Sequence, residues 1–446
     1  MNIASGAMQP TRPGERDQAL DFVRGTALLG IGVVNGAFFF TPFMHAVHPP
    51  VAEWDSWLTR ATWFVNSALF QGKFIALFSL LFGLGLAMQL ERATAAGRSR
   101  WRFAMRRLLV LAGFGLAHAM LIWYGDILFA YSLTAWIVVL TSRLPDRWVG
   151  RLAAVALCVM PTCMGGAIAV QAVFPEVTAA FQPPVAGTTG ESVVEASDGA
   201  EVVPAPRGWD AMVAAMGDPN NPAWIDAETV AMQAGPPMDR QLFRSVNWAY
   251  AILSWPMWGS HSAGMMLVGA WLWRKRATAP GPAAAAVLAR LRAIGLLVGL
   301  PFSLIGTALL LGDPLAGAQR GQLGSLLFLV GMGTLPLAYF PILLTVGRTL
   351  HGWFVDHVAA IGRMCLTAYI ATSVVAAFVA EGWGLGYFGR LSFTTITLVP
   401  VAIWTAWLLV CLPWLRRHEF GPLEWVWRRL EYGGRGAQKA APVLSD

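Results

Sequence analysis

Charged residues are scarce in this chain of 446 residues. Asp, Glu, Lys and Arg together supply 13% of the sequence, about half the share found in an ordinary soluble protein. Apolar residues supply 56%, and so few charges cannot form a polar shell around so much apolar surface. This scarcity excludes a set of soluble domains and predicts an integral membrane protein.

Cysteine is scarce as well, and several chemical motifs are absent. The four cysteines all lie in apolar segments, so we expect them to pack as small apolar residues and not to form a disulfide framework. The sequence has no Walker motif, no paired Cys-x-x-Cys and no Gly-x-Ser-x-Gly motif, and no ligand pattern identifies a metal. The polar first 19 residues argue against a cleavable signal peptide.

Long apolar runs dominate what is present. Ten of them are long enough to cross a hydrocarbon core about 30 Å thick. The sequence therefore predicts an all-α integral membrane protein with ten transmembrane helices in one bundle. The expected spans are residues 21–43, 70–90, 104–123, 126–142, 148–173, 248–273, 287–311, 322–346, 358–380 and 392–415.

The segments between the spans suggest how the chain is divided. The expected parts are an N-terminal transmembrane half (1–173), an external acidic loop (174–247), a C-terminal transmembrane half (248–415) and a tail (416–446). Within the loop, 182–206 is expected to be disordered and 207–246 to form short helices. Trp54–Phe70 and Phe420–Tyr432 predict amphipathic helices at the membrane surface.

Positive charge alternates from loop to loop. Basic clusters follow the second, fourth, sixth and tenth spans, whereas residues 175–246 hold ten acids against three arginines. Because Lys and Arg accumulate in cytoplasmic loops, both termini are expected in the cytoplasm. The same bias accounts for the net charge of +7, so the lipid bilayer is the expected partner and nucleic acid is not.

Five polar residues fall where hydropathy places the middle or the outer half of the membrane. Such groups are costly unless they are paired or face water, so they mark a functional site by default. We expect His118, Asp126 and Lys73 to line one pocket open toward the outer side, with Asn35 at its floor and His261 nearby. The structural alternatives are a helix cap for Asp126, a snorkelling Lys73 and interhelical hydrogen bonds for the other three.

Other polar residues lie at the two ends of the first span. Asp21 and Arg24 are three residues apart at its start, so they share a helix face and can form an ion pair. Alternatively, Arg24 only anchors the topology. His45 and His48 follow the span on the outer side and are either functional or ordinary loop residues.

Several short motifs carry a resemblance to a known family. They are LDFVRGTA (20–27), GKF (72–74), WYGD (123–126), GRMCLTAY (362–369) and GPLEWVWR (421–428). Over residues 15–143 and 240–433 the chain resembles the YeiB-like membrane proteins, the family catalogued as domain of unknown function 418. This resemblance implies a multi-pass protein of a bacterial inner membrane. The chain departs from the family pattern at Ala368 and Thr372, where Asn and Gln are expected.

The Asp-x-x-Arg-Gly opening is also similar to that of two groups of transmembrane acyltransferases, the type-3 enzymes and the heparan-glucosaminide acetyltransferase-like proteins. This similarity implies transfer of an acyl group from a cytoplasmic donor, such as an acyl-coenzyme A, to a small-molecule, lipid or glycan acceptor at the outer face. For such a reaction, the candidate catalytic residues among the polar groups above are His118, Asp126 and His45, and the candidate substrate-binding residues are Arg24, Asn35, Lys73 and His261.

Two other functions fit the same residues. In a transporter, the buried His, Asp and Lys side chains would relay protons or bind the transported molecule. In a membrane scaffold, they would be structural. No internal repeat is visible, which favours the enzyme over the transporter, because inverted repeats are common in transporters.

Overall fold

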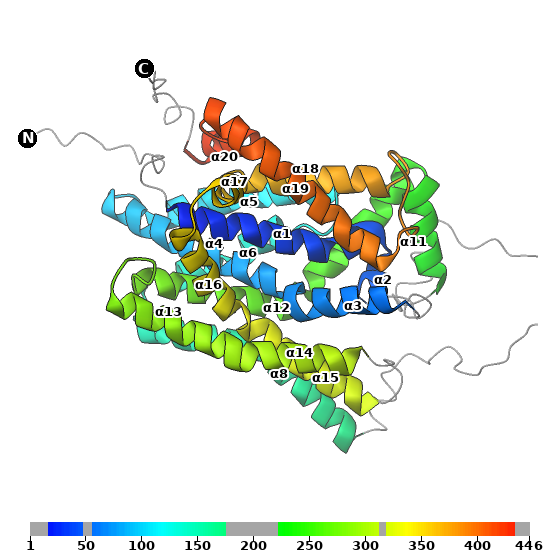
Figure 1. The fold of residues 1–446 in the computed structure, drawn as a ribbon, viewed down its shortest axis with the longest axis horizontal. Helices are drawn as coiled ribbons and strands as arrows, with labels where there is room; N and C mark the ends of the chain where they lie inside the picture. The colour runs from blue at the N-terminus through cyan, green and yellow to red at the C-terminus, as the bar shows by residue number, and fades with distance from the viewer. Residues whose placement is uncertain (1–16, 48–55, 175–221, 312–317, 433–446) are drawn as a thin grey trace, which may run out of the picture.

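The computed structural model describes residues 17–47, 56–174, 222–311 and 318–432, and the regular elements in these ranges are all helical. Most helix axes run along the length of the molecule, side by side (Figure 1). Within these ranges, seven helical segments are long and apolar enough to cross a membrane, or eight if a bent pair counts as one span. The chain is thus an all-α membrane protein, as predicted, but the predicted number of ten spans is not confirmed.

The described helices follow one another in two groups. The first group is α1 (Gln18–Phe40), α2 (Phe43–Val47), α3 (Trp57–Val65), the π-helix η3 (Asn66–Phe70), α4 (Lys73–Ala95), α5 (Arg100–Leu121), α6 (Leu128–Thr134), α7 (Trp136–Leu140), η4 (Thr141–Arg143) and α8 (Asp146–Val173). The second group is α11 (Pro222–Ala234), α12 (Pro237–Arg274), α13 (Pro282–Ile294), η5 (Gly295–Gly299), α14 (Leu300–Leu310), α15 (Ala318–Thr334), α16 (Pro336–Thr349), α17 (Trp353–Arg363), α18 (Cys365–Ala380), α19 (Phe393–Arg417) and α20 (Pro422–Tyr432). Several expectations lie outside the described residues: those for 182–206, 207–221, His48, Trp54 and the tail beyond Tyr432.

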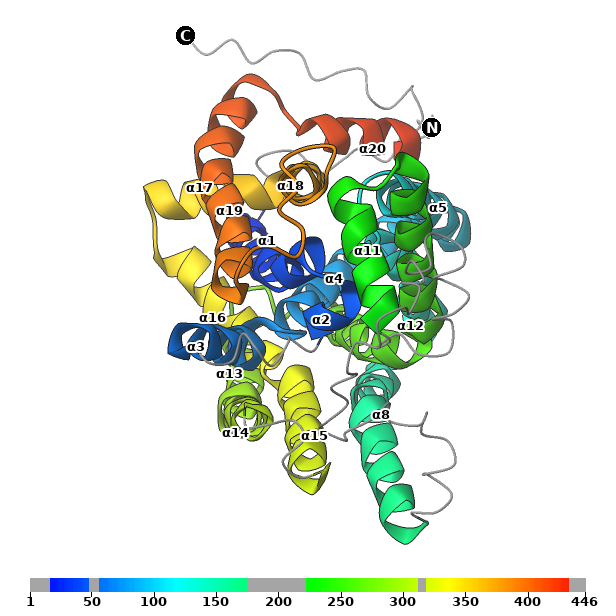
Figure 2. The ribbon, with the colours of Figure 1, turned by 90° about the vertical axis from the view of Figure 1, so that its right-hand side faces the viewer.

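Helix α1 lies at the centre of the bundle. It packs against α4, α16, α17, α18 and α19, and Figure 2 shows these helices around it. The arginine-rich helix ends, the first turn of α1 and α20 gather at one end of the bundle, here called the basic end (Figure 1). At the opposite end α11 lies across the other helices, and this is called the α11 end (Figure 1).

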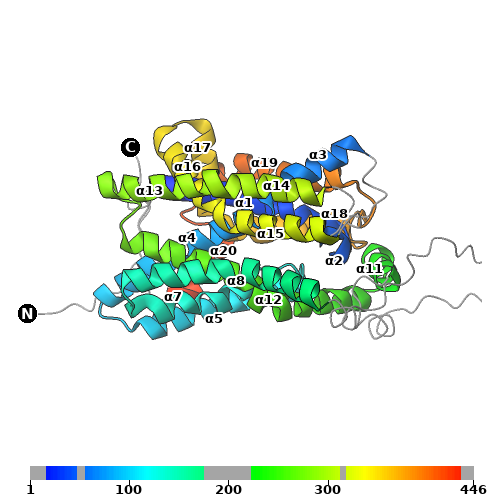
Figure 3. The ribbon, with the colours of Figure 1, turned by 90° about the horizontal axis from the view of Figure 1, so that it is seen from below.

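Besides the second span, three predicted spans differ in the structure. Residues 126–142 form short pieces, α6, α7 and η4, in place of one helix. Residues 358–380 are divided between α17 and α18, whose axes are bent by 85°. Helix α12 begins at Pro237, well before the predicted start, and its 38 residues reach about 57 Å at 1.5 Å per residue. Because of its Ser, His and Trp residues, α12 is less apolar than the seven candidate spans and is not counted among them. By contrast, α13, η5 and α14 form one continuous span (Figure 3).

The second span is interrupted at Gly72, which adopts a left-handed conformation with φ of 75°. The interruption leaves carbonyls at the end of η3 without hydrogen-bond donors inside the helix, and side chains from elsewhere donate to them. The donors are Lys73 Nζ to the Ser67 carbonyl, Ser303 Oγ to that of Ala68 and Tyr339 Oη to that of Leu69, at 2.6, 2.6 and 2.9 Å. A helix on the membrane surface was expected over Trp54–Phe70. In the described part of this stretch, α3 runs along the bundle, parallel to the long helices (Figure 1).

The amphipathic helix predicted for Phe420–Tyr432 is confirmed as α20, which lies against the basic end of the bundle (Figure 1). Trp427 packs on Phe114 with ring centroids 5.9 Å apart, whereas Trp425 is half-exposed. Glu424 lies one turn before Arg428 on this helix. Its carboxylate accepts the backbone N–H groups of Leu366 and Thr367 at 2.7 and 3.1 Å. The tail therefore caps the N-terminus of α18 at the bend.

The bend at the basic end depends on a close crossing between α17 and α1. A Cβ built on Gly362 would lie 1.8 Å from the backbone oxygen of Asp21, so only glycine fits. We expect Gly362→Ala to lower the free energy of unfolding by about 1–3 kcal/mol, because the two backbones must separate. The control is Gly166→Ala in α8, where nothing lies within 4 Å of the added Cβ and alanine favours the helix. Thermal unfolding of both variants in detergent would check this; equal midpoints would contradict it.

Candidate functional site

The central feature of the site is a buried His–Asp pair. His118 lies in the last turn of α5, and Asp126 precedes α6. Nδ1 of His118 is 3.0 Å from Oδ1 of Asp126, and neither side chain is exposed to solvent. The other oxygen of Asp126 accepts the backbone N–H of Phe129 at 2.7 Å. Asp126 therefore acts both as the predicted helix cap and as the partner of His118.

This geometry determines which nitrogen of His118 can act as a base. Because a carboxylate only accepts hydrogen bonds, the proton of the neutral ring lies on Nδ1. Nε2 then carries the free lone pair, and it makes no hydrogen bond with any residue that the structure describes. The ring packs against Tyr369, with centroids 5.0 Å apart, and against Trp123 at 6.2 Å.

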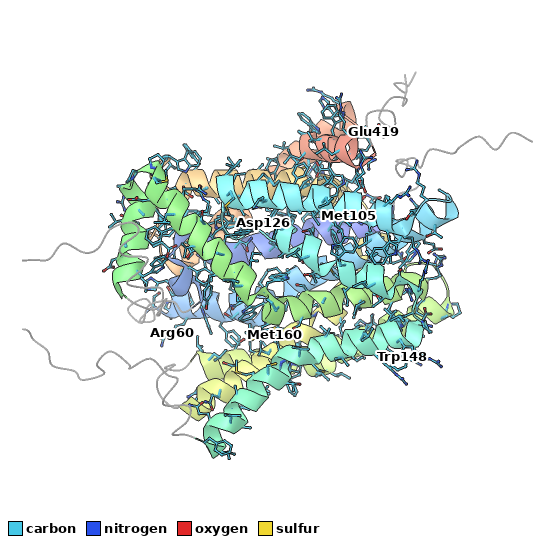
Figure 4. The ribbon with its side chains drawn as sticks, turned by 180° about the vertical axis from the view of Figure 1, so that it is seen from behind. Arg60, Met105, Asp126, Trp148, Met160 and Glu419 are labelled. Atoms are coloured by element: carbon cyan, nitrogen blue, oxygen red, sulfur yellow. The ribbon has the colours of Figure 1, made fainter. Side chains whose placement is uncertain are left out.

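A cavity of about 480 Å³ leads from the basic end toward this pair. Both Asp17 and Ile31 line it, and these residues are separated by about 21 Å along α1 at 1.5 Å per residue. Its inner end is formed by Ile127 and Tyr369, which neighbour Asp126 in sequence and His118 in space. Figure 4 shows Asp126 inside the bundle, nearer α11, while Glu419 lies at the basic end. The cavity is thus deep, and the His–Asp pair lies behind its inner wall, next to Ile127 and Tyr369, without lining it.

The cavity changes character along its depth. Its mouth carries arginines and acids, and its inner walls are apolar and aromatic. The arginines are Arg24, Arg92, Arg107, Arg363 and Arg428, and the acids are Asp17, Asp21, Glu424 and Glu431. The inner walls include Leu28, Ile31, Phe78, Phe82, Leu111 and Tyr131. Such a gradient suits a long ligand with a charged head and a less polar arm.

Arg24 lies at this mouth. Its Nη1 donates to Oδ1 of Asp21 at 2.7 Å, so the predicted ion pair is confirmed. Arg107 is held in the same way by Glu431 at 2.6 Å. Both arginines line the cavity, where a guanidinium can bind an anion.

Lys73 and His261 lie apart from the His–Asp pair. Lys73 is fully buried, with its Nζ on the Ser67 carbonyl and 4.0 Å from the ring centroid of Phe328 in α15. His261 is its buried neighbour, and neither residue lines the large cavity. Figure 2 shows α5 and α15 on different sides of α4. Because His118 and Asp126 do not line that cavity either, the expected single pocket and its opening toward the outer side stay predictions.

Asn35 and His45 have different surroundings. Asn35 lines a small hollow of about 20 Å³ beside Tyr369 and Ser373, next to the inner end of the large cavity. His45 lies on α2 at the α11 end and is half-buried. In the described ranges, no three His, Cys, Asp or Glu side chains are grouped to hold a metal ion.

Sequence reasoning missed a buried polar network at the α11 end. Glu381, after α18, accepts Nη2 of Arg244 at 3.0 and 3.1 Å. Glu228, on α11, accepts Nδ2 of Asn247 at 2.6 Å and the backbone N–H of Phe43 at 3.3 Å. Glu228 and Arg244 lie in the predicted loop 174–247, and Glu381 follows the predicted span 358–380. In such segments an acid that is buried cannot be told from one that is exposed by its sequence pattern. Together they fasten α11 and the start of α12 over the bundle.

Glu228 makes this fastening sensitive to pH. Burial raises the pKa of its carboxyl from 4.5 to about 7, against the hydrogen bonds from Asn247 and Phe43. Because the docked state favours the protonated acid, the stability of docking is fully present below pH 4.5 and is lost as pH rises through about 7. We expect hydrogen exchange of the α11 amides to speed up between about pH 4.5 and 7 beyond the intrinsic increase, an effect of roughly 3 kcal/mol at most. The variant Glu228→Gln should abolish this excess; an unchanged excess would contradict the assignment.

Comparison with known proteins gives relatives over almost the whole chain. The sequence is 28% identical over 439 residues to "Uncharacterized protein YeiB" of Escherichia coli (strain K12), a match covering 95% of this chain and 98% of that protein. It is 26% identical over 438 residues to "Uncharacterized protein YxaH" of Bacillus subtilis (strain 168), covering 96% of each. No solved structure gives a significant match.

A family model adds to these relatives. The model described as "Protein of unknown function (DUF418)" matches residues 272–434, from the end of α12 through α20. This range contains Tyr369 and Glu424 but neither member of the His–Asp pair. The family model and the two full-length relatives agree with the motifs, so the chain is similar to the YeiB-like proteins and to the DUF418 family over residues 272–434.

Proposed function

We propose that this membrane protein is an acyltransferase. The observation that carries the proposal is the buried pair of His118 and Asp126, whose Nε2 makes no hydrogen bond with a described residue and whose ring packs on Tyr369 in the inner wall of a deep cavity with arginines at its mouth. A histidine oriented by a carboxylate is the usual general base of acyl transfer. The arginines of the mouth suit the phosphates of a donor such as an acyl-coenzyme A.

The reaction follows from this arrangement. His118 Nε2 takes the proton of an acceptor hydroxyl or amine, and the acceptor atom bonds to the acyl carbon of the donor thioester. The carbon–sulfur bond then breaks, and His118 returns the proton to the leaving thiolate. Asp126 stays ionised and stabilises the imidazolium that forms in between.

The charge distribution supports an orientation for this reaction. The basic end would face the cytoplasm of a bacterium, where the donor is available, and the α11 end would face outward with the acceptor. Phe39, Trp123 and Tyr124 lie between the pair and α11, so the acceptor would reach His118 after α11 moves.

Reporter fusions test the orientation. We expect fusions after Arg100, Arg276 and Arg435 to report the cytoplasm, and fusions after Gly190 and Gly317 to report the outside, because the basic segments are retained inside. Alkaline phosphatase and fluorescent-protein activities would measure this. A cytoplasmic signal after Gly190 would reverse the orientation and remove the cytoplasmic donor from the proposal.

The activity itself can be tested in inverted membrane vesicles. Vesicles containing the protein would be incubated with acetyl- or longer acyl-coenzyme A carrying a labelled acyl group, and label would be measured in lipid, glycan and small-molecule fractions. We expect transfer that depends on the protein and is absent from matched His118→Gln vesicles. Label that stays on coenzyme A in both preparations would overturn the proposal.

A transporter is the second candidate, favoured by Lys73 and His261. Two ionisable side chains buried beside an interrupted helix are typical of transport sites. In a transporter, Lys73→Met should abolish solute uptake into vesicles, while His118→Gln should not. The acyltransferase predicts the reverse pattern for label transfer, so the two variants distinguish the functions.

A further inference from the structure

The inner end of the cavity holds a second polar atom that its surroundings do not use. Tyr369 lies in α18 and is 8% exposed. The backbone N–H of Ile127 is close enough to act on its hydroxyl oxygen as a donor, but no residue that the structure describes accepts the proton of that hydroxyl. Buried tyrosine hydroxyls usually have a partner, so this hydroxyl is available to a ligand.

Tyr131 shows that a tyrosine in the wall of this cavity can have hydrogen-bond partners, so the position in the wall does not explain why the Tyr369 hydroxyl lacks an acceptor. Tyr131 lines the same cavity, and its hydroxyl is 2.6 Å from Ser79 Oγ and donates to the Ile75 carbonyl at 2.9 Å. Tyr369 lines both the large cavity and the small hollow that contains Asn35. It therefore lies at the point where a ligand entering from the basic end stops.

The position of Tyr369 relative to His118 suggests its role. The two rings are adjacent, with centroids 5.0 Å apart, and both carry a free polar atom. One atom is a base and the other is a hydrogen-bond donor. A carbonyl carbon between them would have its attacking nucleophile beside His118 and its oxygen beside Tyr369.

Helix α18 holds Tyr369 firmly. Its N-terminus is capped by Glu424 one turn before Tyr369, and Ser373 Oγ donates to the Tyr369 carbonyl at 3.2 Å one turn after it. A donor that is fixed before the reaction stabilises developing charge without the cost of reorienting.

We propose that Tyr369 is a catalytic residue whose hydroxyl donates a hydrogen bond to the acyl carbonyl oxygen. This inference rests on the proposed acyl transfer. When the acceptor attacks, the carbonyl oxygen gains negative charge and Tyr369 stabilises it. When the carbon–sulfur bond breaks, the carbonyl re-forms. Tyr369 keeps its proton throughout, and the only proton moved is the one that His118 carries from acceptor to leaving group.

The test is Tyr369→Phe, which removes the hydroxyl and keeps the ring. We expect kcat for acyl transfer to fall about 10²–10³-fold, as for loss of an oxyanion donor, with KM for the acyl-coenzyme A and the unfolding midpoint unchanged. Tyr339→Phe is the matched control. Its hydroxyl donates to the Leu69 carbonyl away from the cavity, so its loss should lower the midpoint and leave kcat unchanged.

Donor binding can be followed separately through Cys365, which lines the cavity. In a background with Cys158, Cys163 and Cys411 replaced by serine, acyl-coenzyme A should slow maleimide labelling of Cys365 equally in the parent protein and in the Tyr369→Phe variant. Transfer by this variant within threefold of the parent, or a changed KM with the same kcat, would overturn the inference and leave the proposed function intact. A lower midpoint would assign the hydroxyl a structural bond and would also overturn it. A parent protein with no transfer at all would remove both proposals.

Discussion

Replacing His118 by glutamine should lower the rate of acyl transfer by about 10²–10⁴-fold, the usual contribution of a general base. Glutamine can still hydrogen-bond to Asp126, so the helix ends should stay in place, but it cannot take a proton from the acceptor. The measurement is label transfer from acyl-coenzyme A by purified variant in vesicles. Membrane insertion and Cys365 protection by the donor should be unchanged.

The variant Asp126→Asn tests whether Asp126 determines which nitrogen of His118 carries the proton. Asparagine keeps the cap on the Phe129 N–H, but its amide can donate to Nδ1 and so favours the tautomer whose proton lies on Nε2. His118 then has no free lone pair toward the cavity, and the rate should fall as far as in the histidine variant. The control is His418→Ala, at the exposed end of α19. If Asp126→Asn retained full activity, Asp126 would be a helix cap only.

The sequence predicted the pair because its members are close along the chain. Eight residues separate His118 from Asp126, and a tight turn joins the helices that carry them. Their contact therefore needs no knowledge of the bundle. Lys73 and His261 were placed in the same pocket by depth alone. Hydropathy gives depth in the membrane but not the side of a helix or the order of helices around α1, so it could not separate two clusters.

The predicted number of ten spans was not confirmed for a related reason. Hydropathy measures how apolar a stretch is, and residues 358–380 are apolar over most of their length. The bend between α17 and α18 depends on Gly362 against Asp21 and on Glu424 at the N-terminus of α18. Glu424 lies 58 residues away from the amide it caps. Tyr369 was missed because in the sequence it is one more aromatic residue of a span, and only its empty hydrogen-bond position distinguishes it.

The second large effect is expected at the α11 end. Glu381→Ala should lower the free energy of unfolding by about 3–5 kcal/mol, because it leaves the buried guanidinium of Arg244 without its carboxylate. Arg244 is 8% exposed and Glu381 5%, so water cannot replace the lost partner. Thermal unfolding in detergent measures the change. The control is Arg276→Ala, which breaks the exposed pair with Glu91 and should cost less than about 1 kcal/mol.

A double variant distinguishes the loss of the pair from the burial of a lone charge. In Arg244→Met with Glu381→Leu, both charges of the pair are replaced by apolar groups, and most of the stability should return because Arg244 is no longer a buried unpaired charge, while Arg240, 4.0 Å from Glu381, keeps its bond to the Gly235 carbonyl. Hydrogen exchange of α11 should then be slow again, since the helix is also held by the bond from the Gly382 N–H to the Met232 carbonyl at 2.8 Å. A double variant as unstable as Glu381→Ala would show that the ion pair itself, and not the penalty for an unpaired arginine, holds α11 over the site.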